Sequence, residues 1–591
     1  MGRDDGVEVS RDTHRLALTG ILVLLGGVLV LTMPRGTFTI DESSYIASIV
    51  GLQDGTLAVE ASTNLAPSPE LYGFDAAPRG RPLVAPVASS SPPLYAPIAL
   101  PFSLLGVRGL MALQILSFLA CAALVFTFVR RIAQRDDVAW LAFVTFVVGS
   151  FTLEYAQAIW PHALSMALVM GAFELASRVR AGASPWLAAG AGACVAIAAG
   201  LRYQNIVLVA AVALGLAFVP RPRLRAALLA FVIGAAPVIL ASSFMNHVRY
   251  DSWNPISKGG GYLEVARGRS QSADIVVEAF TSTWGRVVDY SVWPVSPDLT
   301  KDADTGAITL GKYTKKALLQ SAPWAIVPLI AMMFALRRRS SSAVVDPTRT
   351  ELLAMGVIVA GTLGTFAIFG FKRYDGWSFN QRYFLELVPL LACGVALVIA
   401  RAALPLRHLL TGVMAGAALG FAVLFVDAQW RGFALMKIPF VLALGACAAW
   451  YLASRAKVSI AAFVAVLGIS LGWAASMQLG DDLPGSRWIR LANAERLAHL
   501  EPYIPDEPTV LFTYGGNKDA YGPLLLDHDI LIVDTWIDEG KTARAVIDSA
   551  FAAGRRVFIL APIPREILMP MVAHLRGSRV EGTPDLLEIR P

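Results

Sequence analysis

Long apolar segments separated by short polar loops occupy most of the first 480 residues of the chain. About 20 apolar residues span a bilayer as a helix. Counted in this way, the pattern predicts about thirteen spans, near residues 14–33, 107–130, 136–155, 159–178, 184–201, 204–219, 225–245, 319–336, 351–371, 383–401, 408–426, 436–453 and 457–477. We therefore expect a mainly α-helical, polytopic transmembrane bundle over residues 1–480.

The composition supports a membrane protein. Apolar residues make up 55% of the chain and charged residues 16%, whereas a soluble globular protein carries about 25% charged residues. The net charge of +6 comes from arginines and lysines in short loops, where they indicate topology and not a nucleic-acid partner. All four cysteines lie inside apolar segments without metal-ligand or pairing spacing, so no disulfide framework is expected.

The basic loops give the orientation of the bundle. Positive residues concentrate on the cytoplasmic side of membrane proteins, and here they follow alternate spans, on the side of the N-terminus: Arg130, Arg131, Arg178, Arg180, Arg221, Arg223, Arg225, Arg337, Arg338, Arg339, Arg401, Arg407, Arg455 and Lys457. The N-terminus is thus predicted in the cytoplasm. The loops at about 35–106, 246–318 and 372–382 are then external, as is everything after about residue 478.

The last part of the chain, residues 485–591, differs in character. Short β-like runs such as TVLFTY, ILIVDTW, RVFIL and DLLEI alternate with helix-like segments, and Gly554 is placed to end one of these helices. This alternation predicts a small extracytoplasmic α/β domain on a partly parallel sheet.

Two adjacent carboxylates, Asp41 and Glu42, follow the first span directly, in the run TFTIDESSYIASIV. Ionised groups near the membrane are costly to desolvate, which favours a functional role. The structural alternative is a solvated loop or a helix N-cap.

Other polar residues fall at the outer ends of spans, on the same side as Asp41. They are Glu154, His162, Arg202, Lys372, Arg373, Arg382 and Tyr383. Arg382 opens an apolar helix on the outer face, where a lipid phosphate is the natural partner; snorkelling, or an ion pair with Glu386 one turn on, is the alternative. His162 is either a structural residue or, with Asp41 and Glu154, a ligand to a divalent cation.

Taken together, these segments resemble the GT-C membrane glycosyltransferases, the superfamily of the protein O-mannosyltransferases and the lipid A aminoarabinose transferases. The resemblance rests on an N-terminal span, DESSY at the start of a long external loop and SPPLY closing it, with TLEYAQAIWPHALSM, GLRYQN, NHVRYDSWNPISKGGGYL and YDGWSFNQRYFLELVP at later outer ends. It covers most of residues 14–400. The aminoarabinose transferases have a Lys-Pro pair where this chain has Ser91-Pro92-Pro93, so their sugar donor is not carried over.

The resemblance implies transfer of a sugar from a polyprenyl-phosphate donor to a hydroxyl of a glycan, glycolipid or protein acceptor, with inversion. It also implies that the protein lies in a bacterial inner membrane. Asp41 would be the base and Glu42 would orient it or the acceptor. Arg382, with Lys372, Arg373 and Arg202, would bind the donor phosphate. Tyr45, Tyr95, Glu154, His162 and Tyr383 are the candidate contacts of acceptor or sugar, and no metal site is assigned. The alternatives are a transporter or flippase, and an inactive scaffold subunit of the same fold.

Overall fold

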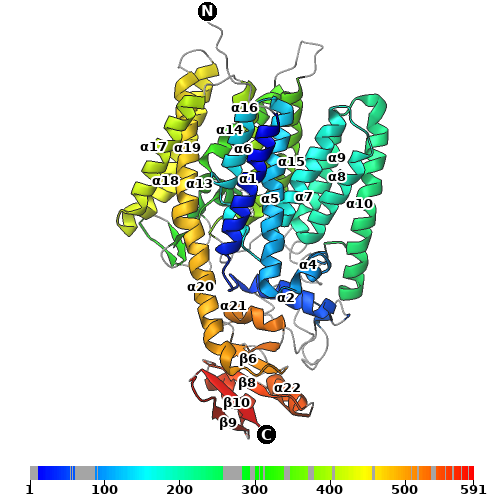
Figure 1. Cartoon of the computed structure of the whole chain (residues 1–591), viewed down its shortest axis with the longest axis vertical. Coiled ribbons are helices and arrows are strands. Elements are labelled where there is room, and N and C mark those ends of the chain that lie inside the picture. Colours follow the sequence, from blue (N-terminus) through cyan, green and yellow to red (C-terminus); the bar gives the residue numbers. More distant parts are fainter. Residues whose placement is uncertain are drawn as a thin grey trace, which may run out of the picture.

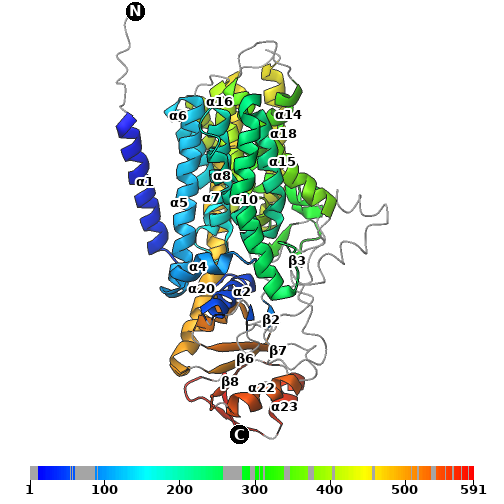
Figure 2. The same ribbon diagram turned by 90° about the vertical axis from the view of Figure 1, so that its right-hand side faces the viewer.

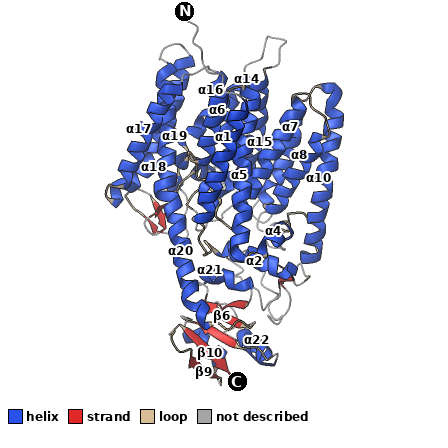
Figure 3. Ribbon diagram, in the orientation of Figure 1, coloured by secondary structure: helices blue, strands red, loops and turns tan. Residues whose placement is uncertain are grey.

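A computed structural model of the chain describes residues 11–53, 55, 58–59, 87–88, 91–256, 283–292, 300–304, 307–310, 313–337, 346–369, 379–401, 406–454 and 460–507, and, with short gaps, 509–591. Helices predominate, and a small mixed sheet lies near the C-terminus (Figures 1 and 3). The prediction of a mainly helical chain with a small C-terminal mixed sheet is therefore confirmed.

Each segment predicted to span the membrane contains a helix. These helices run side by side from the N-terminal end of the molecule toward the sheet (Figures 1 and 2), and they are α1 (Arg11–Leu31), α5 (Gly106–Ala133), α6 (Asp136–Val147), α7 (His162–Arg180), α8 (Leu187–Leu201), α9 (Ile206–Gly215), α10 (Arg221–Tyr250), α14 (Ile326–Arg337), α15 (Pro347–Phe369), α16 (Val388–Arg401), α17 (Leu406–Leu424), α18 (Ala428–Ser454) and α19 (Ile460–Met477). Within the described residues, six helices are long and apolar enough to cross a membrane. The count of about thirteen spans remains a prediction.

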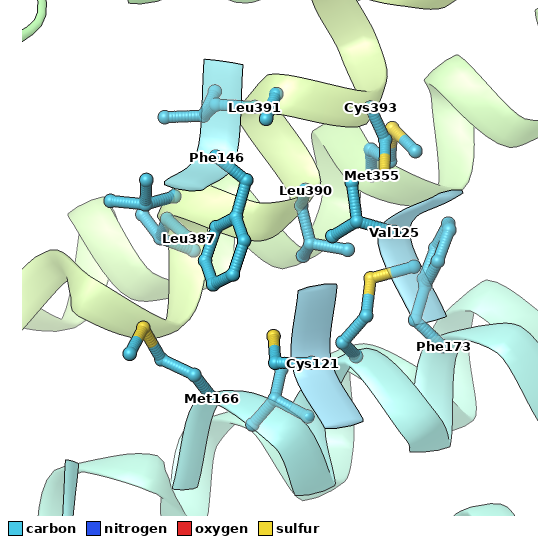
Figure 4. Packing of buried hydrophobic residues seen from close by; sticks show 14 of the residues in the cluster. Cys121, Val125, Phe146, Met166, Phe173, Met355, Leu387, Leu390, Leu391 and Cys393 are labelled. Atoms are coloured by element: carbon cyan, nitrogen blue, oxygen red, sulfur yellow. The ribbon is translucent and has the colours of Figure 1, made fainter. Parts of the chain in front are cut away.

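The core of the bundle is apolar and tightly packed (Figure 4). Side chains from α5, α6, α7, α15 and α16 meet there, among them Cys121, Val125, Phe146, Met166, Phe173, Met355, Leu390 and Cys393. All four cysteines are free, as expected. Because lipid tails are as apolar as these side chains, close van der Waals packing holds such helices together.

Glycines bring α17 and α19 into backbone contact. A Cβ atom added at Gly416 would lie 2.0 Å from the carbonyl oxygen of Ile469, and one at Gly472 would lie 2.0 Å from that of Val413. Small residues spaced four apart allow this approach in membrane helices. The α17–α19 pair therefore depends on residues that contribute almost no side chain.

The loop after α1 has a described helix at each end. It begins with α2 (Ile40–Gln53) and closes with α4 (Tyr95–Ser103), and the two-residue strands β1 (Ala58–Val59) and β2 (Val87–Ala88) pair antiparallel between them. A second short sheet joins β3 (Thr300–Lys301), β4 (Ile308–Leu310) and β5 (Tyr313–Thr314) ahead of α13 (Leu318–Ser321).

The last bundle helix continues into the tail. A π-helical turn (Gln478–Asp482) joins α19 to α20 (Leu483–Leu500), so one helical rod links the bundle to the C-terminal sheet. In Figures 1 and 2 this rod passes the level of α2 before it reaches the sheet.

The tail forms the predicted α/β unit. Its strands β6 (Val510–Tyr514), β7 (Asp529–Val533), β8 (Val557–Leu560), β9 (Arg576–Arg579) and β10 (Leu586–Arg590) lie in the order β7-β6-β8-β10-β9. Strand β6 runs parallel to β7 and β8, while β10 is antiparallel to β8 and β9. Alternate residues of a strand face opposite sides: Phe512 and Ile559 meet α22 (Lys541–Ala552) and α23 (Arg565–Val572), whereas Leu511 and Phe558 face the bundle.

Candidate functional site

Asp41 and Glu42 form the first turn of α2. Carboxylates at this end of a helix are stabilised by its unpaired N–H groups and by the helix dipole. The helix lies between the bundle and the C-terminal sheet, beside α4 (Figure 2). The acidic pair thus lies where the helical bundle, the loop after α1 and the C-terminal tail meet.

Asp41 is paired with Arg382. The carboxylate Oδ2 accepts a hydrogen bond of 2.7 Å from Arg382 Nη1, and the two side chains are 36% and 16% exposed. The guanidinium carbon lies 5.3 Å from the ring centroid of Trp160 and 5.6 Å from that of Tyr383. Two aromatic rings therefore hold the cation against a carboxylate that solvent still reaches.

Glu42, in contrast, is fully buried. Both of its oxygens accept hydrogen bonds from Arg490, at 2.9 and 2.7 Å. The backbone N–H groups of Phe38 and Ile159 donate two more, at 2.5 and 2.8 Å. The two neighbouring carboxylates thus differ. Asp41 is reached by solvent, whereas Glu42 is buried and links the segments that contain Phe38, Ile159 and Arg490.

Arg202 contacts the backbone of Arg382. Its Nη2 donates to the backbone carbonyl of Arg382 at 2.8 Å, and its Nη1 forms a buried ion pair of 2.7 Å with Glu386. Asn205 and Ser165 also donate to that carboxylate, at 3.1 and 2.6 Å. The alternative in which Glu386 neutralises Arg382 is wrong, because Glu386 is occupied by Arg202.

The predicted tyrosines lie close to this pair. Tyr45 is one turn after Asp41, and its ring meets that of Tyr95 edge-on with centroids 4.8 Å apart. The Tyr95 hydroxyl donates to the carbonyl of Ile159 at 2.5 Å. Burial raises the pKa of Tyr45 above its ordinary value, and the Asp41 carboxylate raises that pKa further. Tyr45 is therefore a neutral hydroxyl beside Asp41.

Glu154 belongs to a separate buried cluster. Asn380 donates to its Oε2 at 3.1 Å. Burial raises the pKa of Glu154 well above its usual range, and the charge of Asp482 adds to this effect. Lys316 bridges Asp481 and Asp482 in the π-helical turn that precedes α20. The structure thus surrounds Glu154 with protein groups and leaves it 5% exposed.

His162 lies in an aromatic stack. Its ring is stacked on Tyr155 and Trp160, with centroids 5.2 Å away in each case. No described residue forms a hydrogen bond to either ring nitrogen. Across the described ranges, no group of three His, Cys, Asp or Glu side chains is arranged to hold a metal, so Asp41, Glu154 and His162 are not brought together as ligands.

Two predicted cations cannot be placed, and others were missed. Lys372 and Arg373 lie outside the described residues. No sequence pattern indicated Arg490 or Arg286. Arg286 is buried, and its guanidinium carbon lies 5.2 Å from the Tyr383 ring centroid. Asp481 and Asp482 had a usable signal, since they follow the last span as Asp41 and Glu42 follow the first.

Comparison with solved structures identifies the fold. The crystal structure of ArnT from Cupriavidus metallidurans bound to undecaprenyl phosphate superposes with a TM-score of 0.54, covering 98% of both chains at 14% sequence identity. This chain has the ArnT fold. The predicted structural resemblance to GT-C membrane glycosyltransferases is thus confirmed at the level of fold. The arabinosyltransferase EmbB from Mycobacterium smegmatis also matches, with a TM-score of 0.45 and 15% identity over 84% of this chain and 44% of EmbB. No family model and no curated protein matches the sequence.

Proposed function

We propose that this protein transfers a sugar from a polyprenyl-phosphate donor to an acceptor hydroxyl on the extracytoplasmic face of a bacterial inner membrane, with inversion of the anomeric centre. The observation that carries the proposal is the Asp41–Arg382 pair, a solvent-reachable carboxylate bonded to an aromatic-flanked cation. The ArnT structure of the same fold holds undecaprenyl phosphate, which supports a polyprenyl phosphate as the ligand.

The two residues supply the two charges that this reaction needs. The Asp41 carboxylate would accept the acceptor's hydroxyl proton as the oxygen attacks the anomeric carbon. The bond from that carbon to the phosphate oxygen breaks in the same step, and Arg382 would stabilise the negative charge that the leaving phosphate gains. Attack from the face opposite the phosphate inverts the anomeric centre.

The ion pair also relates donor binding to the base. In the structure Asp41 accepts a hydrogen bond from Arg382. A donor phosphate competes for the same guanidinium N–H groups, because arginine binds phosphate and carboxylate through the same fork. Donor binding would therefore free Asp41 to accept a proton. Arg202 acts here through the backbone of Arg382, since its own charge is neutralised by Glu386.

Of the five predicted contacts of acceptor or sugar, two keep that role in the proposal and three take another. Tyr45 and Tyr383 flank the pair and would contact sugar or acceptor, whereas Tyr95, Glu154 and His162 are buried and would shape the site. The topology proposed from the basic loops places the N-terminus in the cytoplasm and the tail outside. It agrees with Figure 1, in which α2 and the sheet lie at the end of the bundle away from the N-terminus.

A transfer assay in nanodiscs tests the proposal. Labelled polyprenyl-phosphate sugars are supplied to the wild type, to Asp41→Asn and to a control, Asp137→Asn, whose carboxylate lies in an exposed ion pair on the other side of the bundle. We expect the wild type and Asp137→Asn to consume one donor and Asp41→Asn to be slower by about 10²- to 10⁴-fold, the usual contribution of a general base. Equal turnover in all three would reject Asp41 as the base.

If the wild type consumes no donor in a broad panel, its binding to undecaprenyl phosphate is measured next. Binding without turnover is the result that a flippase or an inactive scaffold subunit gives. No binding would overturn the assignment of Arg382 to a phosphate.

A further inference from the structure

One face of α20 holds the segment that leads into α2. Arg490 Nη1 donates to the carbonyl of Gly36 at 3.3 Å, and Asn493 Nδ2 donates to the carbonyl of Thr37 at 2.9 Å. A Cβ atom at Gly36 would lie 2.0 Å from the carbonyl oxygen of Arg490, so this position requires a glycine. The backbone of the first external loop therefore rests directly on α20.

The Glu42–Arg490 pair completes this contact. The side chains are 0% and 3% exposed and form two parallel hydrogen bonds. The Arg490 guanidinium carbon also lies 5.4 Å from the ring centroid of Phe38. A buried two-fold bond of this kind fixes both the position and the orientation of a carboxylate. Since Glu42 is held, so is the helical turn to which it belongs.

The C-terminal unit reinforces the same turn from the other side. A short 3₁₀ helix (Gly522–Leu526) follows α21 (Lys518–Tyr521) and packs on α2 so closely that a Cβ at Gly522 would lie 2.1 Å from Ser43 Oγ. An apolar cluster joins the two parts; it includes Ile46, Ile49 and Val50 of α2 and Leu497, Leu511, Tyr521, Leu524 and Phe558 of the tail. Burial of this apolar surface from water stabilises the docked arrangement.

We propose that Arg490 is a positioning residue for Asp41, and that the docked C-terminal unit acts as a clamp on the helix that carries it. The inference rests on the proposed function, in which Asp41 is the base. Asp41 and Glu42 are adjacent in the first turn of α2, so any shift of Glu42 moves Asp41. A displacement of about 1 Å in a reacting group lowers the rate by roughly 100-fold. Arg490 touches neither substrate in this scheme and acts only through Glu42.

Steady-state kinetics of three variants test the role of Arg490. We expect Arg490→Leu to lower kcat by about 100-fold while KM for the donor is unchanged, because Arg382 still binds the phosphate. Arg490→Lys retains the charge but loses the fork, so its kcat should lie between those of the wild type and Arg490→Leu. The control is Arg487→Leu, one turn away on the exposed face of α20, which should behave as wild type. An Arg490→Leu enzyme with wild-type kcat per folded molecule would overturn the proposal.

A readout independent of activity separates this inference from the proposed function. Hydrogen–deuterium exchange is measured over α2, with α16 in the bundle core as the internal reference. We expect Arg490→Leu and Arg490→Lys to increase exchange in α2 and leave α16 unchanged. This result with a wild type that transfers no sugar would reject the proposed function and retain the clamp. Unchanged exchange in α2, or an equal increase in both helices, would overturn the clamp. If Arg490→Leu does not fold, Arg490→Lys is decisive by the same criteria.

Discussion

Arg382 Nη1 lies 2.7 Å from Asp41 Oδ2, although 341 residues separate the two in the chain. The pair brings together the start of the loop that follows α1 and the 3₁₀ turn that leads into α16. An arginine bonded to an accessible carboxylate is stable without ligand and can exchange that carboxylate for a phosphate. Mutation of Arg382 therefore tests both its contact with Asp41 and its binding of phosphate.

Replacing Arg382 should remove both donor binding and transfer. We expect Arg382→Leu to lower kcat/KM by about 10²- to 10³-fold, the cost of losing one transition-state donor, and to weaken binding of undecaprenyl phosphate. Arg382→Lys should recover only part of the loss because a lysine has no fork. Arg135→Leu, which removes an exposed arginine outside the site, is the control. Undiminished binding of the lipid by Arg382→Leu would show that the phosphate lies elsewhere.

The buried Arg202–Glu386 pair should matter for stability. Removing one partner leaves a buried charge unpaired, so Arg202→Met or Glu386→Leu should each destabilise the fold by about 3–5 kcal/mol. The double variant should lose less than the sum of the two, which thermal unfolding of the purified protein can measure. Arg544→Met, in the more exposed Arg544–Asp548 pair of α22, should cost about 0.5 kcal/mol at most. Strictly additive losses would argue against a direct interaction.

The contact between α17 and α19 predicts a sharp difference between two glycines. Gly416→Ala places a Cβ atom against the Ile469 carbonyl and should destabilise the bundle by about 1–3 kcal/mol. Gly27→Ala, where no atom lies within 4 Å of the new Cβ, should be neutral. The yield of folded protein after detergent extraction and its melting temperature provide the measurement. Equal behaviour of the two variants would contradict the close approach of these helices.

Glu154 predicts a pH dependence. Its folded-state pKa is raised, whereas an unfolded glutamate titrates near about 4.3. Between these two pKa values the folded protein keeps a proton that the unfolded chain has lost. The contribution of Glu154 to the stability of the fold is therefore complete below about pH 4.3 and is lost as the pH rises through the folded-state pKa. Glu154→Gln should remove this dependence of the melting temperature on pH between about 4.3 and the raised pKa of Glu154. Glu495→Gln, on an exposed face of α20, should not change it. Melting temperatures measured across the pH range decide between them.

The sequence predicted the fold better than it predicted the contacts within the site. Long apolar runs determine helices because the bilayer permits few other structures, so each predicted span contains a helix. The number and order of the predicted spans already placed Asp41, Arg202 and Arg382 on the same side of the bundle. Arg490 was not predicted, since its partner Glu42 is 448 residues away and nothing in the polar sequence of α20 marks it. The partner of Glu386 was also not predicted. Helical spacing favours an ion pair of Glu386 with Arg382, and only the tertiary structure brings Arg202 to Glu386.

The Glu42–Arg490 bond also sets an order for biosynthesis. Glu42 leaves the ribosome 448 residues before Arg490 does, an interval of roughly 20–90 s at ordinary rates of synthesis. During that interval the acidic turn of α2 lacks the arginine that holds it. Any chain that stops before α20 therefore lacks one wall of the site, however well its membrane helices have inserted. The candidate catalytic centre is complete only once α20 has been made.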